Sequence, residues 1–292
     1  SEFEETGVNI LDYITLSEQF AVLIGGRYSD YEDKLGDFED DDFSLRGGVV
    51  YMPTEDLSFY GSYAEGYQSS NGLLNINDDV IDPVTSEAYE LGVKYALRDE
   101  QLFISAVLFD VTQEGLAFVA NPFDDQGEPT LPADIRYANL GEITSQGIEF
   151  ELTGQITDAW RIQGGYTYLD NEITRGGIGQ FNGALPEGNR LPGVAKNALN
   201  LFSFYEFNVA DGLLGLGGGI FAQSDVFIST ENKAEYDGWT TVDLAAYYKT
   251  QSWKVQLNIS NLFDEEYRQA QALTTTDAFA AIRVGTSSQR TI

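Results

Sequence analysis

The stretch Asn258-Ile-Ser-Asn-Leu-Phe-Asp-Glu-Glu-Tyr267 lies near the C-terminus and directly follows the segment Trp253-Lys-Val-Gln-Leu257. In that segment the apolar residues Trp253, Val255 and Leu257 alternate with polar ones. Such alternation is typical of a β-strand that has one apolar face and one polar face. The alternation breaks at Asn-Leu-Phe-Asp, and an aromatic residue follows. The stretch therefore predicts a strand that ends in a turn.

The same alternation recurs along the chain. In Tyr89-Glu-Leu-Gly-Val-Lys-Tyr95 the apolar side chains oppose Glu90 and Lys94, and in Gly147-Ile-Glu-Phe-Glu-Leu-Thr153 they oppose glutamates. Segments of this kind are 10–14 residues long, close to the ~9–11 residues of a tilted transmembrane strand. The predicted strands cover residues 7–16, 20–31, 43–53, 57–69, 86–97, 101–113, 144–155, 159–172, 196–207, 213–225, 239–250 and 252–263, and a last one begins near Gln289.

The connections between these segments alternate in length. Short turns are predicted at residues 54–56, 98–100, 157–158 and 250–251, and longer polar stretches at 32–42, 70–85, 117–135, 175–195 and 226–237. An outer-membrane barrel has short turns on its periplasmic side and long loops on its outer side, whereas a soluble sandwich has no reason for this rhythm. The rhythm therefore indicates an all-β fold, an antiparallel transmembrane β-barrel.

Aromatic residues are placed as membrane-boundary belts would require. Three tryptophans stand at predicted strand ends, and several tyrosines lie toward the opposite ends: Trp160, Trp239 and Trp253, and Tyr63, Tyr67, Tyr166 and Tyr168. A ring with an apolar body and a polar edge suits a membrane–water boundary. These rings could also be the core of a soluble β-protein, but the polar or glycine-rich opposite strand faces favour the barrel.

Composition excludes several classes of function. The 292 residues carry a net charge of −31 and include no Cys and no His. Nucleic-acid binding needs a basic surface, and Cys/His zinc sites and His-dependent triads need the missing residues. The acidic stretch 30–42 is interpreted as a solvated loop and not as a calcium site, because its spacing matches no EF-hand. No metal site and no cofactor are expected.

Four charged residues inside predicted strands are expected to face the interior of the barrel. A basic residue that faces lipid at the membrane midplane costs roughly 2–4 kcal/mol, so a charged side chain within a strand belongs on the lumen side. The four residues are Glu90, Lys94, Glu149 and Arg161.

Several segments, taken in order, resemble the barrel of TonB-dependent outer-membrane receptors of the siderophore-receptor type. The resemblance rests on Phe20–Tyr28 with its Gly-Gly-Arg-Tyr, on Leu57–Tyr67, on Ser86–Lys94 with its Glu-x-Gly-x-Lys, on Asn139–Glu149, on Leu191–Lys196 and on the C-terminal Asn-Leu-Phe-Asp segment. Each segment alone is weakly specific, whereas their order and spacing together are specific to this family.

The resemblance implies a location, a domain organisation and a mechanism. The family barrel has 22 strands and encloses a plug, so residues 1–292, with about 12–13 strands, are expected to be the C-terminal portion of a barrel, truncated at both ends and without the plug. The protein is then a bacterial outer-membrane active-transport receptor and not an enzyme. Implied partners are a ferric siderophore or similar chelate, the TonB complex acting through the plug, the lipid bilayer and lipopolysaccharide, with a monomer as the complete form.

The resemblance also suggests which residues meet the plug and the ligand. The inward-facing residues Glu90, Lys94, Glu149 and Arg161 are expected to contact the plug. Ligand contacts are expected from aromatic and basic residues at strand tops and in loops, because arginine pairs well with anionic chelates. These candidates are Tyr67, Phe118, Phe123, Arg136, Arg175, Phe181 and Arg190.

The sequence leaves two other functional interpretations open. A passive porin-like or structural outer-membrane barrel would share the strand rhythm and the aromatic belts. A secreted soluble β-protein that binds or hydrolyses glycans would need a carboxylate pair across a cleft, and with 47 acidic residues such a pair could occur by chance. Within the receptor reading, an importer of cobalamin or a saccharide remains an alternative to a siderophore receptor.

Overall fold

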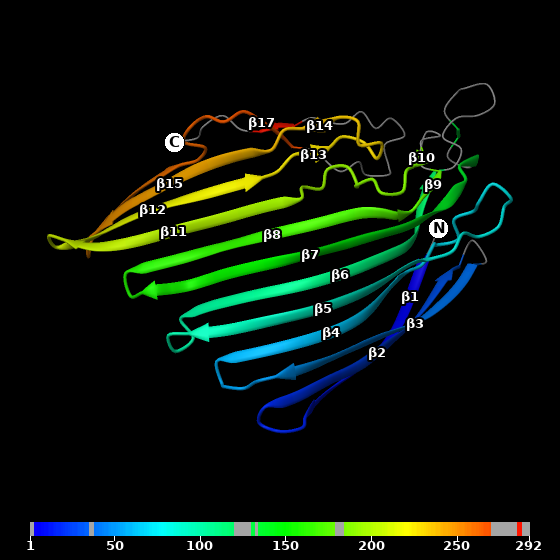
Figure 1. Cartoon of the computed structure of the whole chain (residues 1–292), viewed down its shortest axis with the longest axis horizontal. Coiled ribbons are helices and arrows are strands. Elements are labelled where there is room, and N and C mark those ends of the chain that lie inside the picture. The colour runs from blue at the N-terminus through cyan, green and yellow to red at the C-terminus, as the bar shows by residue number, and fades with distance from the viewer. Residues whose placement is uncertain are drawn as a thin grey trace.

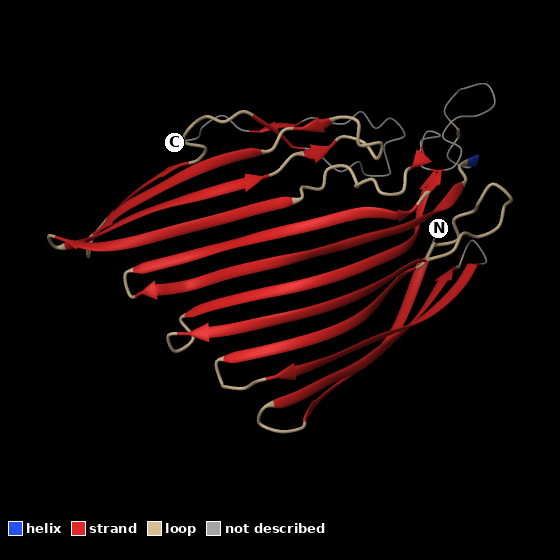
Figure 2. Ribbon diagram, in the orientation of Figure 1, coloured by secondary structure: helices blue, strands red, loops and turns tan. Residues whose placement is uncertain are grey.

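A computed structural model describes residues 3–34, 38–119, 130–131, 134–178, 184–269 and 285–287. Its main element is a twelve-stranded antiparallel sheet bent into a trough (Figures 1 and 2). The strands of this sheet, in spatial order, are β1 (Phe3–Thr15), β2 (Phe20–Asp33), β3 (Phe38–Tyr51), β4 (Leu57–Gln68), β5 (Val84–Leu97), β6 (Leu102–Val119), β7 (Tyr137–Thr157), β8 (Trp160–Arg175), β11 (Asn197–Val209), β12 (Gly212–Gln223), β15 (Trp239–Lys249) and β16 (Lys254–Ile259).

Three short hairpin pairs lie outside this sheet. They are β9 (Gly177–Ile178) with β10 (Ala184–Leu185), β13 (Val226–Phe227) with β14 (Glu235–Tyr236), and β17 (Tyr267–Gln269) with β18 (Gly285–Ser287). No helix within the described residues is long and apolar enough to cross a membrane.

Each strand of the large sheet pairs only with its neighbours in the chain order. The connections at one end of the sheet are short, as between β7 and β8, and those at the other end are long, as between β8 and β11 (Figure 1). The predicted alternation of short turns and long loops is thereby confirmed except between β2 and β3, where β2 ends at Asp33 and β3 begins at Phe38. Within the described chain β1 and β16 are the edges of the sheet.

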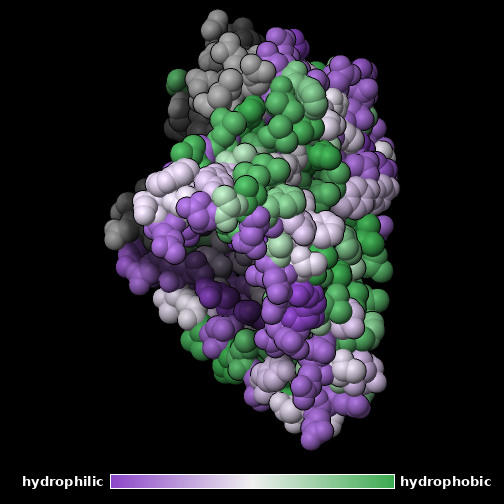
Figure 3. Space-filling view, turned by 90° about the vertical axis from the view of Figure 1, so that its left-hand side faces the viewer, coloured by the Kyte–Doolittle hydropathy of each residue, from purple (hydrophilic) through white to green (hydrophobic). Residues whose placement is uncertain are grey.

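The register separates the side chains into an apolar face and a polar face. Residues that pair from strand to strand form rows across β4 to β8. One row consists of Gly61, Leu91, Leu108, Ile148 and Tyr168. The adjacent row, on the opposite face, consists of Ser62, Glu90, Phe109, Gly147 and Leu169. Successive residues of a strand point to opposite faces, so the first row belongs to an apolar face and the second to a more polar one. In Figure 3, which looks along the sheet from the end with the short turns, hydrophilic residues lie in the hollow of the trough.

Within the described residues no protein layer packs on the apolar face. Leu91 is 61% exposed and Leu108 is 53% exposed. Among the described residues very few hydrophobic side chains are buried: Ala21, Ile81, Ile143, Ile173 and Val226. A wall with a bare apolar outer face and a polar inner face is the design of a barrel in lipid, where the membrane takes the place of a second layer.

Some expected boundaries differ from the structure. The predicted loop at 32–42 is mostly strand, because β2 runs to Asp33 and β3 begins at Phe38, and β2 and β3 stay paired there. The predicted strand 252–263 is shorter and is paired only over Lys254–Ile259. The strand expected near Gln289 lies outside the described residues.

The tryptophans do not all lie at one end of the sheet. Trp160 and Trp253 lie at the end with the short turns, as expected for a belt, whereas Trp239 begins β15 at the end with the long loops. Trp239 stacks on Tyr267 with ring centroids 4.3 Å apart, so it fastens the segment after β16 to the sheet.

The Asn-Leu-Phe-Asp segment is a turn held to β15. Asn261 is buried and has a positive φ of 50°, and its backbone N–H donates to the Asp243 carboxylate at 2.8 Å. Its side-chain amide also bonds the backbone of Glu265 in both directions. Asparagine adopts this left-handed conformation more readily than most residues, so its place at this turn has a local physical cause.

Candidate lumen wall and loop-end site

The four charged residues expected to face inward share the polar face of the sheet. The register aligns Glu90 with Ser62, Lys94 with Ser105 and Glu149 with Val107 on that face. Arg161 is aligned with Gln155 and lies on the same face. The sheet therefore presents all four to the hollow of the trough.

The inner face carries an ordered polar network on β8, β11 and β15. The Arg161 guanidinium pairs with the Glu206 carboxylate, which also accepts a hydrogen bond from the Tyr247 hydroxyl. The guanidinium lies 5.8 Å from the centroid of the Phe204 ring. Lys254 lies 4.7 Å from the centroid of the Tyr247 ring. Arg161 is therefore held in one orientation by the wall itself.

The inner carboxylates nearer the middle of the sheet are less engaged. Within the described residues Glu90 and Glu149 form no ion pair closer than 4 Å, and neither carboxylate accepts a hydrogen bond. Lys94 lies 5.1 Å from the centroid of the Tyr60 ring. These side chains remain available to whatever fills the trough.

Aromatic rings on the inner face lie over glycines of neighbouring strands. A Cβ added to Gly92 would lie 2.3 Å from the Tyr60 ring, and one added to Gly217 would lie 2.1 Å from the Phe204 ring. Each ring lies flat along the wall only because the neighbouring strand has no side chain there. These side chains therefore project less far into the trough, which leaves room in it.

The candidate ligand residue Tyr67 lies at the loop end of β4 and is engaged with β2 and β3. Its hydroxyl donates to the Asp40 carboxylate, and its ring packs against Tyr31 with centroids 5.7 Å apart. The Ser69 hydroxyl donates to the same carboxylate at 2.9 Å. Asp40 lies in the acidic stretch, so part of this stretch anchors the base of the β4–β5 loop. Within the described residues no cluster of three acidic side chains could hold a metal ion.

The candidates Arg136 and Arg175 are each beside a carboxylate. Arg136 pairs with Asp78 at 2.6 Å. Arg175 lies 3.4 Å from Glu114 and lines a pocket of about 510 Å³ at the loop ends of β5 to β8. The register carries Thr85, Glu114 and Arg175 on the same sheet face as the apolar rows, so this pocket is on the outer side of the wall.

The candidate Arg190 lies in a platform formed by two loops. We use the name loop platform for residues 186–196 and 226–236. Asn232 accepts a hydrogen bond from the Arg190 backbone N–H and returns one to the Arg190 carbonyl. The Arg190 guanidinium donates to the Val194 carbonyl at 3.0 Å and lies 5.6 Å from the Phe227 ring centroid.

The loop platform is attached to the inner face of the sheet. The Leu191 backbone N–H donates to Asn171, and Leu191 packs on Ile143 and Ile173, which face each other across β7 and β8. Asn171 and Asn232 were not among the expected site residues. Their only sequence signal is that they are polar residues near predicted loops, which is too weak to select them.

The structure does not bring the described candidates together in one pocket. Tyr67, Arg136, Arg175 and Arg190 lie on separate loops or strand ends, and Arg175 lines the pocket at the loop ends of β5 to β8. The side chains of Phe118, Phe123 and Phe181 lie outside the described part of the structure. Lys196 is a further basic residue with a carboxylate partner. Its ammonium donates a hydrogen bond to Asp170 at 3.1 Å, and this bond raises the pKa of Lys196.

The chain matches a known family over most of its length. Residues 1–262 match the model for "TonB dependent receptor-like, beta-barrel". The chain therefore belongs to this family of outer-membrane barrels, as the Asn-Leu-Phe-Asp segment and the order of its strands indicated. It lies in the bacterial outer membrane.

Named relatives and a solved structure agree with this assignment. The chain is 29% identical over 291 residues to the "Probable TonB-dependent siderophore receptor PiuA" of Acinetobacter baumannii, with 90% of this chain and 37% of the relative covered. It is 27% identical to the metal-pseudopaline receptor CntO of Pseudomonas aeruginosa, with 91% and 38% covered. The crystal structure of the A. baumannii siderophore receptor PiuA superposes with a TM-score of 0.78 at 26% identity and covers 99% of this chain and 42% of that one. The chain thus spans about two fifths of the length of these relatives.

Proposed function

We propose that this chain is the C-terminal part of the wall of an active importer of ferric siderophores or similar metal chelates. The observation that carries the proposal is the family match over residues 1–262 together with relatives named for siderophores and for a metal chelate. The polar inner face supports it, because an importer must offer polar contacts to a plug inside the wall. In this proposal the wall performs no chemistry.

The proposal includes strands and a plug supplied from outside this chain. Within the described residues β1 and β16 each have a strand on one side only, and lipid does not tolerate unpaired backbone groups. Further strands would close the barrel to about 22 and enclose the plug, through which the TonB complex would act. We propose that the closed barrel is a monomer surrounded by phospholipid and lipopolysaccharide.

A transport assay tests this function. The intact receptor would be expressed in cells that lack their own siderophore receptors, and uptake of radiolabelled iron would be measured with a panel of catecholate, hydroxamate and mixed chelates. We expect uptake of at least one chelate, abolished when TonB is removed. Uptake that persists without TonB would establish the passive-barrel alternative, and no uptake across the panel would refute the siderophore assignment. Cobalamin and saccharides belong in the same panel as competing substrates.

The inner carboxylates are proposed contacts of the plug. Glu90 and Glu149 have no partner within the described wall, whereas Arg161 is already held by Glu206. In the intact receptor, joint replacement of Glu90→Gln and Glu149→Gln is expected to raise hydrogen exchange in the plug, because charge-assisted bonds across the lumen are lost. The Glu55→Gln, Glu100→Gln variant, which removes two exposed carboxylates from the short turns, is the matched control. Unchanged plug exchange in the double variant would refute the contact.

The loop platform is the proposed ligand-facing surface. It is attached to the inner face through Leu191 and Asn171 and carries the Arg190–Phe227 pair. The Arg190→Gln variant is expected to weaken chelate binding more than Arg175→Gln, because Arg175 lies in a pocket on the outer side of the wall. Binding would be measured by titration of the intact receptor. A greater loss in Arg175→Gln would reverse this assignment.

A further inference from the structure

A line of aromatic rings runs along the inner face of β11, β12 and β15. From the end with the short turns toward the end with the long loops, the residues that carry these rings are Tyr247, Phe204, Phe202 and Phe221. We call these four residues the aromatic strip, and the register places all of them on the face that carries Arg161. The Phe204 ring lies 5.3 Å from the Tyr247 ring and 6.4 Å from the Phe202 ring between centroids, and each pair is nearly parallel at 14°.

The aromatic strip lies on glycines of β12. A Cβ added to Gly215 would lie 2.5 Å from the Phe204 ring. One added to Gly219 would lie 2.7 Å from the Phe202 ring and 3.1 Å from the Phe221 ring, so these two rings adjoin across this glycine. The rings therefore lie against the wall. All four side chains of the strip are half-buried, so the remaining surface of each ring faces the hollow of the trough.

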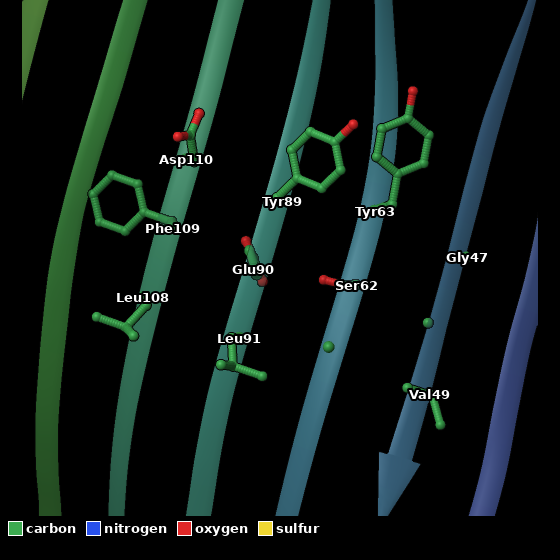
Figure 4. Close-up of a pocket in the computed structure, with 12 residues that line it drawn as sticks. Gly47, Val49, Ser62, Tyr63, Tyr89, Glu90, Leu91, Leu108, Phe109 and Asp110 are labelled. Atoms are coloured by element: carbon green, nitrogen blue, oxygen red, sulfur yellow. The ribbon is translucent and has the colours of Figure 1, made fainter.

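The inner face of β4 to β6 is built differently. Its row of Ser62, Glu90 and Phe109 combines one ring with a hydroxyl and a carboxylate on three neighbouring strands (Figure 4). Polar groups of this kind hold a partner in one position, because hydrogen bonds have defined directions and lengths. Ring faces attract flat groups and fix their position much less. The aromatic strip is therefore suited to a partner that moves along the wall.

Basic side chains lie beside the aromatic strip at the end with the short turns. Lys249 and Lys254 are directly paired on the inner face, and the Lys254 ammonium lies 4.7 Å from the centroid of the Tyr247 ring. Within the described residues neither lysine forms an ion pair with a carboxylate. Like charges directly opposite each other destabilise a sheet. In a chain with a net charge of −31, this lysine pair makes the end of the strip a local site of attraction for an anion.

We propose that the aromatic strip is a transit contact for an anionic chelate whose metal is held by aromatic rings, such as a ferric catecholate. This inference rests on the proposed function and gives the wall a part in the passage of the chelate. The ring faces of such a chelate stack on the strip, and its negative charge complements Lys249 and Lys254. When the plug is displaced, the chelate moves from one ring to the next, because several weak contacts permit both entry and release.

Removal of two ring faces in the intact receptor tests the proposal. The Phe202→Leu, Phe204→Leu variant keeps apolar side chains at both positions. Initial rates of radiolabelled iron uptake from a ferric tricatecholate would be measured in cells over a range of concentrations. We expect the maximal rate to fall about fivefold. The dissociation constant of the chelate, measured by titration of the resting receptor, should stay unchanged, because the strip is met only after the plug has moved.

Two matched variants serve as controls. Tyr205 and Phe207 form a ring pair with centroids 4.7 Å apart on the outer face of the same strand. The Tyr205→Leu, Phe207→Leu variant should therefore leave uptake unchanged. The Phe202→Tyr, Phe204→Tyr variant keeps two ring faces in the aromatic strip and should restore most of the lost rate.

Four outcomes would overturn the proposal. Equal maximal rates in the leucine variant of the strip and in the wild type would show that the rings take no part in passage. Increased hydrogen exchange of the plug in the resting leucine variant would assign the rings to the plug. Uptake of ring-free hydroxamate chelates alone would refute the class of ligand. These three outcomes leave the proposed function standing, whereas no uptake of any chelate by the wild type would overturn the proposed function and this inference together.

If the leucine variant of the strip does not fold, cross-linking replaces it. A photoreactive phenylalanine analogue would be placed at position 202 of the intact receptor. During uptake it should cross-link the chelate only in cells that contain TonB, and the same analogue at position 207 should not cross-link it. Cross-linking at position 202 that is absent or independent of TonB would refute the transit contact.

Discussion

The two faces of the large sheet are made from alternate residues of the same strands, yet they differ in the charges that they carry and in which glycines are covered. On the inner face, rings of Tyr60 and Phe204 lie over glycines, and charges such as Arg161 are held by neighbours. On the outer face, the rows of Leu91 and Val93 across β4 to β8 contain no charged residue, and Asp110 lies in the next row toward the loops. Gly47 and Gly61 lie uncovered there. The difference shows that the solvent on each side, and not strand propensity, selects the residue types.

The largest expected effect comes from placing the same charge on either face. Ala106 lies on the outer face between Val93 and Phe150, and its neighbour Ser105 lies on the inner face beside Glu151. We expect Ala106→Arg to lower the free energy of unfolding by roughly 2–4 kcal/mol. Ser105→Arg should cost little, because the Glu151 carboxylate is within reach. Urea unfolding of the intact receptor in bilayers measures both, and equal losses would contradict the assignment of faces.

An intermediate effect is expected from adding one methyl group to a covered glycine. A Cβ at Gly147 would lie 2.1 Å from the Tyr168 carbonyl oxygen and 2.6 Å from the Phe109 ring. Since backbone cannot move aside as a side chain can, Gly147→Ala should cost roughly 1–3 kcal/mol. Gly61→Ala should change stability by less than about 0.5 kcal/mol. The same unfolding assay applies, and a stable Gly147→Ala variant would show that β7 and β8 are spaced differently.

The smallest effect is expected from polar pairs. Glu206 is partly buried and joins Arg161 to Tyr247, so Glu206→Gln should cost about 1 kcal/mol. The Lys233–Glu231 pair at 2.8 Å is exposed on a loop, and Glu231→Gln should have no measurable effect. Thermal unfolding of both variants measures the difference. A larger loss in Glu231→Gln would mean that the loops, and not the wall, carry the important ion pairs.

Sequence patterns predicted the wall well because alternation and turn length are local properties. The twelve strands, their order along the wall and the inward side of Glu90, Lys94, Glu149 and Arg161 all follow from these patterns. The extension of β2 to Asp33 and the start of β3 at Phe38 were missed because consecutive acidic residues conceal the alternation there. Pairing with a neighbouring strand, rather than composition, decided the structure of that stretch.

The loop end was predicted less well because its contacts join residues that are far apart in sequence. Nothing in the sequence indicates that Arg190 would be held by Asn232, or that Tyr67 would reach Asp40. Basic residues were chosen as ligand candidates by type alone. In a chain with 47 acidic and 16 basic residues, a carboxylate is often near an arginine, as at Arg136 and Arg175. Type alone therefore cannot separate a ligand contact from a local ion pair.

The neighbour-to-neighbour pairing of β1 to β16 has a consequence for how the wall forms. Every ladder of the large sheet joins strands that are consecutive in its order, so each pairing closes only the turn or loop between two successive strands, and its entropic cost is lower than that of joining distant parts of the chain. We expect the wall to grow one hairpin at a time along the chain, with each completed hairpin serving as the template for the next. Only the final seam between first and last strands of the closed barrel joins distant parts of the sequence, and it is expected to set the rate of assembly.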